Sequence, residues 1–319
     1  MLQAMRETSP RTLTAAASYG LCNRLAVLLS GMAIAEATGR QFTMLWPRTN
    51  ACSAQFSELF ASDLTVIESP SAEVSRLRET NRFAPHKLDL LAVRNPNMVV
   101  WGCSWLLEPD RIPAHRQFMT RGAEILAGLQ PIGEIQTQID KFQSAHFRPR
   151  MIGVHLRRAD LRFLAPSATA NTACAMRIVD EYLTACPDAG ILLCTDDGAI
   201  DQNSGAALSV EGVRHKFLRR YGDRIVYTTP RSLDRRDPVA IQDALVDLWL
   251  LRQTDYLVGT VGSSFSEMAA FGRTIPLRRC ESEHTLRFLT PLGFWWRRER
   301  PLKAVLRLYW RFIRPRGVR

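Results

Sequence analysis

The sequence lacks paired cysteines at metal-site spacing and long hydrophobic runs. It has seven cysteines, an odd number, and none stands two residues from another as in Cys-x-x-Cys. We therefore expect buried thiols in a reducing compartment, with neither a disulfide framework nor a zinc site. No apolar stretch reaches the roughly 18 residues of a membrane span. Residues 1–10 lack the apolar core of a signal peptide. These absences predict a cytoplasmic protein.

Lysine is also scarce, since only four of the 42 basic residues are lysine and 38 are arginine. The formal net charge is +11, but its excess is concentrated in the tail. Nine basic residues and only Glu299 lie between Arg297 and Arg319, a net +8 that leaves +3 for the rest. A nucleic-acid-binding protein carries its basic surface on the folded domain. We therefore predict no nucleic-acid partner.

Short apolar runs alternate with helical stretches, which predicts an α/β fold of parallel sheets covered by helices. A first helix is expected after a glycine turn, with Leu25, Leu28 and Leu29 on its apolar face. Further helices are expected at Ala173–Cys186, Arg214–Arg220 and Pro238–Arg252. Strands are expected at Leu13–Ala17, Phe42–Trp46, Val99–Cys103, Met151–Leu156, Ile191–Thr195, Arg224–Tyr227, Tyr256–Gly259 and Ile275–Leu277.

The polar stretch Gln143–Arg150, which contains Pro149, is the expected boundary between two Rossmann-like domains that face each other across a cleft. Residues 1–145 form the first predicted domain and residues 146–290 the second. Residues 291–319 form a basic amphipathic tail, in which apolar residues recur at helical spacing from Leu302 to Ile313. A helix over 301–314 can lie on an anionic membrane surface. The alternative is a helix that packs its apolar face on the body of the protein.

The most informative segment is Gly153–Asp160, in which an apolar strand ends in His155, Arg157 and Arg158. Ligands bind at the carboxyl edge of open α/β sheets, where this polar end should emerge. The planar guanidinium group matches phosphate oxygens in two-bond geometry. The alternative is a surface arginine pair with Asp160 as a structural partner, since arginine pairs are common in this chain.

Acidic side chains follow the next strand, where Leu192–Thr195 runs into Asp196 and Asp197. Carboxylates there can accept hydrogen bonds from ribose hydroxyls or a guanine edge, or they can bind a metal. A metal-dependent transferase usually shows Asp-x-Asp, whereas this pair is adjacent and is followed by Gly198. The pattern therefore favours a site without metal. A turn or helix cap built from both aspartates is the structural alternative.

Two further segments join a strand to a helix. After Asp247 and the strand at Tyr256, the chain runs through Ser263 and Ser264 into a helix that begins near Phe265. Small residues there let backbone N–H groups approach a phosphate at a helix N-terminus, although either serine alone could be an ordinary N-cap. The other segment, Tyr19–Leu25, contains Asn23 and Arg24. Its single glycine by itself would indicate only a tight turn.

Together these segments resemble the fucosyltransferase superfamily, which includes α-1,6-, α-1,2- and protein O-fucosyltransferases. The matching motifs occur in order as Gly-x-x-Asn-Arg-Leu, His-x-Arg-Arg-x-Asp, Thr-Asp-Asp, and Asp-x-x-x-Leu followed by Gly-Thr-x-Gly-Ser-Ser. The resemblance implies a GT-B fold and an inverting, metal-independent transfer of fucose from GDP-fucose to a glycan hydroxyl. It implies no cofactor besides this donor. The second domain would hold the donor and the first would lie on the acceptor side.

The resemblance also assigns roles to residues. Arg157 would contact the β-phosphate, with His155 and Arg158 in the same pocket, and Asp160 is the nearest candidate for the base. The other predicted donor contacts are Asp196, Asp197 and Asp247 for the nucleoside, Ser263 or Ser264 for the phosphates, and Asn23 and Arg24 at the cleft border.

Two features depart from the family pattern. Cys22 stands where many members have glycine, and Leu161–Ala170 lacks the glutamate of α-1,6 members. The base and the linkage therefore stay open. A different GDP-sugar donor, or a nucleotide- or membrane-binding module without catalysis, remains an alternative. The acceptor would be a glycan, lipid-linked if the basic tail brings the enzyme to the inner membrane face.

Overall fold

The computed structural model describes residues 10–17, 19–69, 89–102, 104–107, 109, 112–157, 165–196 and 212–280, with backbone only at 165–170. Four predictions fall on residues outside these ranges: Arg158, Asp160, Asp197 and the basic tail 291–319.

A four-stranded parallel sheet forms the first half of the chain, in the order β4-β2-β1-β5. Its long helix, α1 (Leu21–Ala37), follows β1 directly and packs beside α3 (Arg116–Gly128), which continues the short turn η1 (Pro113–His115). The strands are β1 (Thr12–Ala17), β2 (Gln41–Leu45), β4 (Val66–Ile67) and β5 (Asn97–Gly102).

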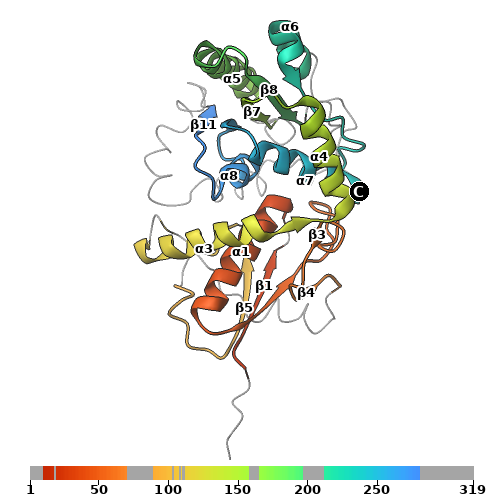
Figure 1. Cartoon of the computed structure of the whole chain (residues 1–319). Coiled ribbons are helices and arrows are strands. Elements are labelled where there is room, and N and C mark those ends of the chain that lie inside the picture. Colours follow the sequence, from red (N-terminus) through yellow and green to blue (C-terminus); the bar gives the residue numbers. More distant parts are fainter. Residues whose placement is uncertain are drawn as a thin grey trace, which may run out of the picture.

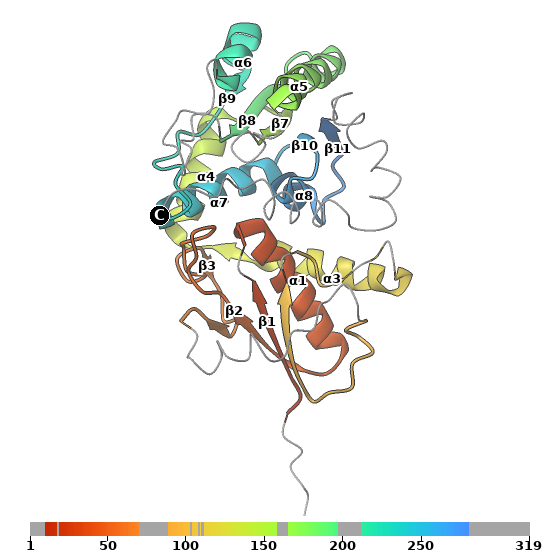
Figure 2. The same cartoon turned by 180° about the vertical axis from the view of Figure 1, so that it is seen from behind.

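A five-stranded parallel sheet forms the second half, in the order β11-β10-β7-β8-β9. Figures 1 and 2 show the two sheets in separate halves of the molecule. The strands are β7 (Met151–Leu156), β8 (Gly190–Thr195), β9 (Ile225–Val226), β10 (Tyr256–Thr260) and β11 (Leu277–Cys280). The helical elements are α5 (Ala165–Ala185), α6 (Val213–Tyr221), η3 (Gly222–Arg224), α7 (Pro238–Arg252) and α8 (Ser264–Ala270).

These sheets confirm the predicted α/β class with parallel strands. Helix α7 has the predicted bounds because Pro238 occupies its first turn and Asp237 caps it, accepting a hydrogen bond from the Val239 N–H at 3.0 Å. The last strand was placed too early, at Ile275–Leu277. It begins at Leu277, and its four residues pair with β10 from Leu257 to Thr260.

The connection between the halves is also more ordered than its polar composition indicates. Helix α4 (Gly133–His146) occupies the first part of the expected boundary and packs against α7 in the second half. A short antiparallel pair, β3 (Phe60–Ala61) with β6 (Gln130–Pro131), precedes it. Sequence analysis found neither this pair nor α3 and α4, although apolar residues recur at helical spacing in both helices, at Phe118, Ile125 and Leu126 in α3 and at Ile135, Ile139 and Phe142 in α4.

The hydrophobic core runs across both halves. One cluster of buried side chains includes Leu13 and Leu28 of the first half together with Leu192 and Leu251 of the second. A second cluster lies on the other face of the second sheet, where Ile152 and other β7 residues meet α5 and α6. Alternation along the strands assigns successive residues to opposite faces. Each face of the second sheet therefore has its own packing, and one of them is continuous with the first half.

Besides the contact of α4 with α7, further contacts join the halves. Phe271, directly after α8, packs on Trp105 with ring centroids 4.5 Å apart, and α8 contacts α1. On the other side, the Ser53 N–H donates to the Arg235 carbonyl at 3.2 Å. These contacts hold the carboxyl ends of the two sheets toward each other.

Close packing beneath β7 predicts a stability difference between two glycines. A Cβ at Gly153 would lie 2.7–2.8 Å from Leu257, Leu251 and Thr254 side chains, whereas one at Gly128 would meet nothing within 4 Å. We expect Gly153→Ala to lower the free energy of unfolding by about 1–3 kcal/mol. Gly128→Ala, at the end of α3, should leave it unchanged or raise it by up to about 1 kcal/mol. Urea denaturation measures both, and equal effects would contradict the packing.

Candidate functional site

The candidate site lies where β7, β8 and β10 end and face the start of α1. Because these strands are parallel, their carboxyl ends share one edge, which brings together Arg157, Asp196 and Ser263 from distant parts of the sequence. Burial raises the pKa of the Cys22 thiol, and the positive charges of Arg157 and then Arg235 oppose this rise. Arg157 is thus within electrostatic range of Cys22 in the first turn of α1. The segments that contain Cys22 and Arg157 therefore approach each other across the two halves.

A threonine holds the end of β7 in place. The Thr260 hydroxyl accepts a hydrogen bond from the Arg157 N–H at 3.0 Å and donates to the His155 carbonyl at 3.2 Å. Thr260 is 2% exposed, so water does not compete for these bonds. The backbone that presents Arg157 is therefore attached to the end of β10.

His155 is buried and neutral. Its Nδ1 lies 2.8 Å from the Ser266 hydroxyl, and its ring stacks on Phe265 at a centroid distance of 4.7 Å. Burial, and then the nearby charge of Arg157, lowers the pKa of His155 to about 3. Ser266 can approach so closely because a Cβ at Gly259 would lie only 2.5 Å from the Ser266 Cβ. His155 therefore contributes hydrogen bonding and shape at neutral pH, but no charge.

Ser263 occupies the N-cap position of α8, but its side chain makes no cap hydrogen bond. Its Oγ is buried and has no hydrogen-bond partner among the residues that the structure describes. Gly262, just before it, has φ +71°, a turn conformation that glycine adopts without strain. Ser264 follows as the first residue of α8 and is half-buried. The ordinary side-chain cap expected as the alternative for Ser263 does not form.

Asp247 of α7 lies beside Cys194 of β8. It accepts hydrogen bonds from the Thr228 hydroxyl at 2.5 Å and from the Cys194 thiol. Burial raises the pKa of Asp247 to about 6, against the opposing effects of the Thr228 hydrogen bond and the Arg214 charge. Cys194 of β8 pairs in register with His155 of β7. Asp247 therefore contacts the residue that lies beside His155 in the sheet.

A cavity of about 320 Å³ lies beside this cluster, between α4, α7 and the segment after β9. Thr228 lines it, together with Tyr227, Gln138 and His146. The hydroxyl that binds Asp247 therefore also borders a space in the lower range of ligand pockets.

Arg24 joins the α1 turn to the loop after β2. It is fully buried and donates to the Tyr19 and Pro47 carbonyls at 2.7 Å, to the Thr49 hydroxyl at 2.9 Å and to the Cys52 carbonyl at 3.4 Å. Its guanidinium group also lies over the Trp46 ring. These contacts give Arg24 a positioning role, and the donor contact expected from the sequence stays a prediction. Asn23, next to it, is half-buried.

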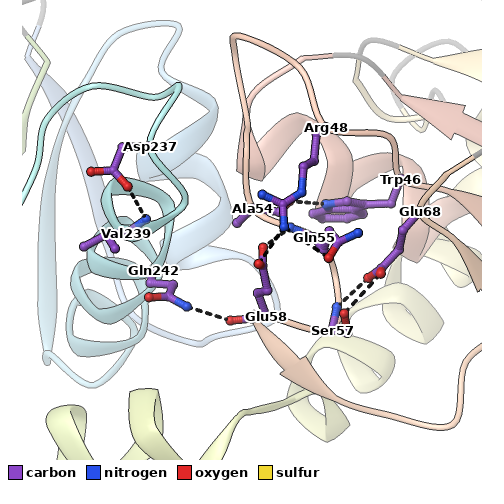
Figure 3. Close-up of polar contacts among 10 residues, drawn as sticks. All are labelled: Trp46, Arg48, Ala54, Gln55, Ser57, Glu58, Glu68, Asp237, Val239 and Gln242. Carbon is purple, nitrogen blue, oxygen red and sulfur yellow. Dashed lines mark hydrogen bonds and ion pairs between the residues drawn. The ribbon is translucent and has the colours of Figure 1, made fainter.

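The loop after β2 forms a second wall that sequence analysis missed. Its Trp46 donates to the Ala54 carbonyl, and Gln242 of α7 donates to the Glu58 carbonyl at 3.2 Å (Figure 3). Ser53 in this loop has a buried Oγ without a partner in the described part of the chain. No sequence motif marks this wall, because its hydrogen bond to α7 joins residues 184 positions apart.

Within the described ranges, no three His, Cys, Asp or Glu side chains are grouped so that they could hold a metal ion. No described helix is long and apolar enough to cross a membrane.

Because His155 is buried and neutral, we expect the protein to lose stability as the pH falls. Because the folded-state pKa is below the unfolded value of 6.5, the unfolded chain binds the extra proton between these values, and stability falls as pH falls. From pH 7.5 to pH 5, this effect amounts to about 2 kcal/mol. The difference in unfolding free energy between wild type and His155→Gln should shrink by this amount. A difference that stays constant with pH would contradict a depressed pKa.

Comparisons with known proteins identify the fold. No family model matches the sequence, and no curated protein matches it significantly. Among solved structures, fucosyltransferase NodZ from Bradyrhizobium has a TM-score of 0.58 at 19% identity, over 83% of this chain and 94% of that one. POFUT1 in complex with GDP has a TM-score of 0.51 at 13% identity, over 86% of this chain and 99% of that one. A mutant of Arabidopsis thaliana FUT1 in complex with GDP has a TM-score of 0.53 at 13% identity, over 86% of this chain and 71% of that one. The chain has the fold of these fucosyltransferases.

Proposed function

We propose that this chain is an inverting, metal-independent glycosyltransferase that moves fucose from GDP-fucose to a glycan hydroxyl. The observation that carries the proposal is the position of Arg157, held by Thr260 at the end of β7 and within electrostatic range of Cys22 at the start of α1. Proteins of the same fold were crystallised with this donor or its product, including NodZ soaked with GDP-fucose and POFUT1 in complex with GDP.

The diphosphate would bind between Arg157 and the N-terminus of α1. A 17-residue helix carries partial positive charge at its first turn, and no acidic residue in that turn of α1 cancels it. The Ser263 hydroxyl, buried and without a partner in the described residues, supplies a further donor. Ser264 and Arg158 complete the phosphate contacts proposed from the sequence.

The nucleoside would bind toward β8, where Asp196 and Asp247 lie and where Asp197 follows in the sequence. A carboxylate accepts hydrogen bonds from ribose hydroxyls and from the N–H groups of guanine. The cavity bordered by Thr228 adjoins this side of the site. The half formed by residues 146–290 thus holds the donor in our proposal, and residues 1–145 provide the acceptor side.

The chemistry follows from where charge develops. As the sugar–phosphate bond breaks, the sugar gains oxocarbenium character and the departing GDP gains negative charge. A guanidinium group fixed beforehand at the phosphate stabilises that charge. Thr260 fixes the Arg157 backbone, and neutral His155 adds no positive charge of its own, so the positive charge beside the phosphate comes from the guanidinium group. The acceptor hydroxyl attacks the opposite face of the sugar, with Asp160 as the proposed base by analogy with inverting glycosidases.

A cytoplasmic location, with peripheral membrane contact through residues 301–314, also stays a proposal from the sequence. It would bring the enzyme to lipid-linked acceptors.

Loss of the Arg157 guanidinium tests the mechanism. We expect Arg157→Ala to lower turnover of GDP-fucose by about 100- to 1,000-fold, the usual cost of losing a donor to developing negative charge. Radiolabelled fucose release or transfer measures this. Arg150→Ala is a matched control, since Arg150 lies at the opposite end of β7, with a side chain 67% exposed and an ion pair to Asp255. Its turnover should stay within about twofold of wild type, because a surface salt bridge contributes little.

The same assay separates the alternatives. Near-normal turnover by folded Arg157→Ala would sink the assignment of this residue. Preference for another GDP-sugar over GDP-fucose would keep the fold and change the donor. Tight GDP binding without release of any sugar would instead indicate a nucleotide-binding module.

Metal independence is a separate prediction. It rests on the adjacent Asp196-Asp197 pair in place of Asp-x-Asp, and on Arg157 providing the positive charge that a divalent cation supplies in other transferases. We expect turnover of GDP-fucose to persist in excess EDTA, within about twofold of its value in added Mg²⁺ or Mn²⁺, because a guanidinium group is not removed by a chelator. Loss of activity in EDTA that is restored by a divalent cation would contradict this part of the proposal.

A further inference from the structure

The loop after β2 borders the N-terminus of α1. Gly20 is the N-cap residue of this helix, and a Cβ added to it would lie 3.6 Å from the Ala51 carbonyl oxygen. Arg24, in the first turn, donates from Nη2 to the Thr49 hydroxyl at 2.9 Å and to the Cys52 carbonyl at 3.4 Å. The loop therefore lies against the helix end at which we expect the diphosphate to bind.

Ser53 is held at this place from both halves of the molecule. The peptide group that joins Cys52 to Ser53 accepts a hydrogen bond from Arg24 through its carbonyl oxygen. Through its N–H, the same group donates to the Arg235 carbonyl at 3.2 Å. Arg24 belongs to α1, whereas Arg235 lies shortly before α7 in the second half. These two hydrogen bonds fix the backbone of Ser53 beside the start of α1.

The Ser53 hydroxyl has unused hydrogen-bonding capacity. Ser53 is 7% exposed, and its buried Oγ has no partner among the residues that the structure describes. Ser30, which is also buried but lies farther along α1, is paired twice. Its hydroxyl donates to the Ala26 carbonyl at 2.5 Å and accepts from the Leu106 N–H at 3.0 Å. Because an unpaired buried hydroxyl is costly, its place beside a helix N-terminus indicates that a ligand supplies the missing partner.

We propose that the Ser53 hydroxyl donates a hydrogen bond to a phosphate oxygen of the bound nucleoside diphosphate, beside the N-terminus of α1. This helix end carries partial positive charge, and its first turn contains no acidic residue. A hydroxyl group can donate, and a phosphate oxygen can accept. The inference rests on the proposed function, because it takes the diphosphate to bind here. It adds a contact from the first half to a sugar donor that the second half otherwise holds.

Positive charges from both halves surround this place. Burial raises the pKa of the Cys52 thiol, and the charges of Arg24 and Arg235 oppose that rise. Burial also raises the pKa of the Cys22 thiol, where the opposing charges are those of Arg157 and then Arg235. Arg235 is therefore within electrostatic range of both thiols. These charges favour an anionic group over a neutral sugar hydroxyl as the partner of the buried serine.

The experiment measures binding of GDP to the full chain by isothermal titration calorimetry, for wild type and for Ser53→Ala. We expect the substitution to weaken GDP binding by about 10- to 100-fold, because a hydrogen bond to a charged phosphate is lost. Affinity for guanosine, which has no phosphate, should stay within about twofold of wild type, since no phosphate contact is involved. The urea midpoint of the unliganded variant should be unchanged or higher, because the hydroxyl has no partner to lose.

Ser30→Ala is the matched control, since it removes a buried hydroxyl that has two partners. Its urea midpoint should fall while its affinity for GDP stays at the wild-type value. Equal GDP affinity of Ser53→Ala and wild type would overturn the inference and leave the proposed function intact. An equal loss of affinity for GDP and guanosine would also overturn it, because the lost contact would not be to phosphate. Absence of GDP binding by folded wild type would instead overturn the proposed function and this inference together.

Discussion

The hydroxyl of Thr260 is the constraint on which the candidate site depends. It joins the ends of two adjacent parallel strands by binding the backbone of both His155 and Arg157. Parallel strands alone bring side chains to a common edge, but they leave the first residue beyond the strand free to turn. A buried hydroxyl removes that freedom without adding charge. Preorganisation of this kind is what makes a guanidinium group effective toward charge that develops during a reaction.

Two titratable side chains near Arg157, His155 and Cys22, stay uncharged because they are buried. Burial, and then Arg157 itself, keeps His155 neutral. Burial also keeps Cys22 a thiol at ordinary pH, although the charge of Arg157 acts in the opposite direction and lowers the Cys22 pKa. Asp196 follows β8 beside the end of β7, where Leu156 pairs with Thr195, whereas Asp247 on α7 accepts hydrogen bonds from Thr228 and Cys194. Arg157 therefore supplies the positive charge at this edge to which a diphosphate could bind, in a chain that shares its fold with fucosyltransferases.

The two halves are not independent around this edge. A single buried cluster continues from the first sheet into the second, and buried Arg24 joins the α1 turn to the loop that contacts Arg235. Arg24 thus supports the site through the backbone. A motif residue can be essential in position without touching a ligand, because a buried guanidinium group satisfies several carbonyl groups at once.

The sequence by itself determined the α/β class, most parallel strands, and the strand ends at which His155, Arg157 and Ser263 lie, because hydrophobic periodicity and turn residues are local signals. Helices α3 and α4 also have apolar residues at helical spacing, such as Phe118 and Ile125 in α3, and sequence analysis missed them. Only the tertiary structure decided which of these residues are buried and what they contact. Thr260 and His155 are 105 positions apart, and Ser266 and His155 are 111 apart. Arg24 is buried, and the Ser263 hydroxyl has no hydrogen-bond partner among the described residues. Both features likewise depend on packing between distant segments, which no local pattern encodes.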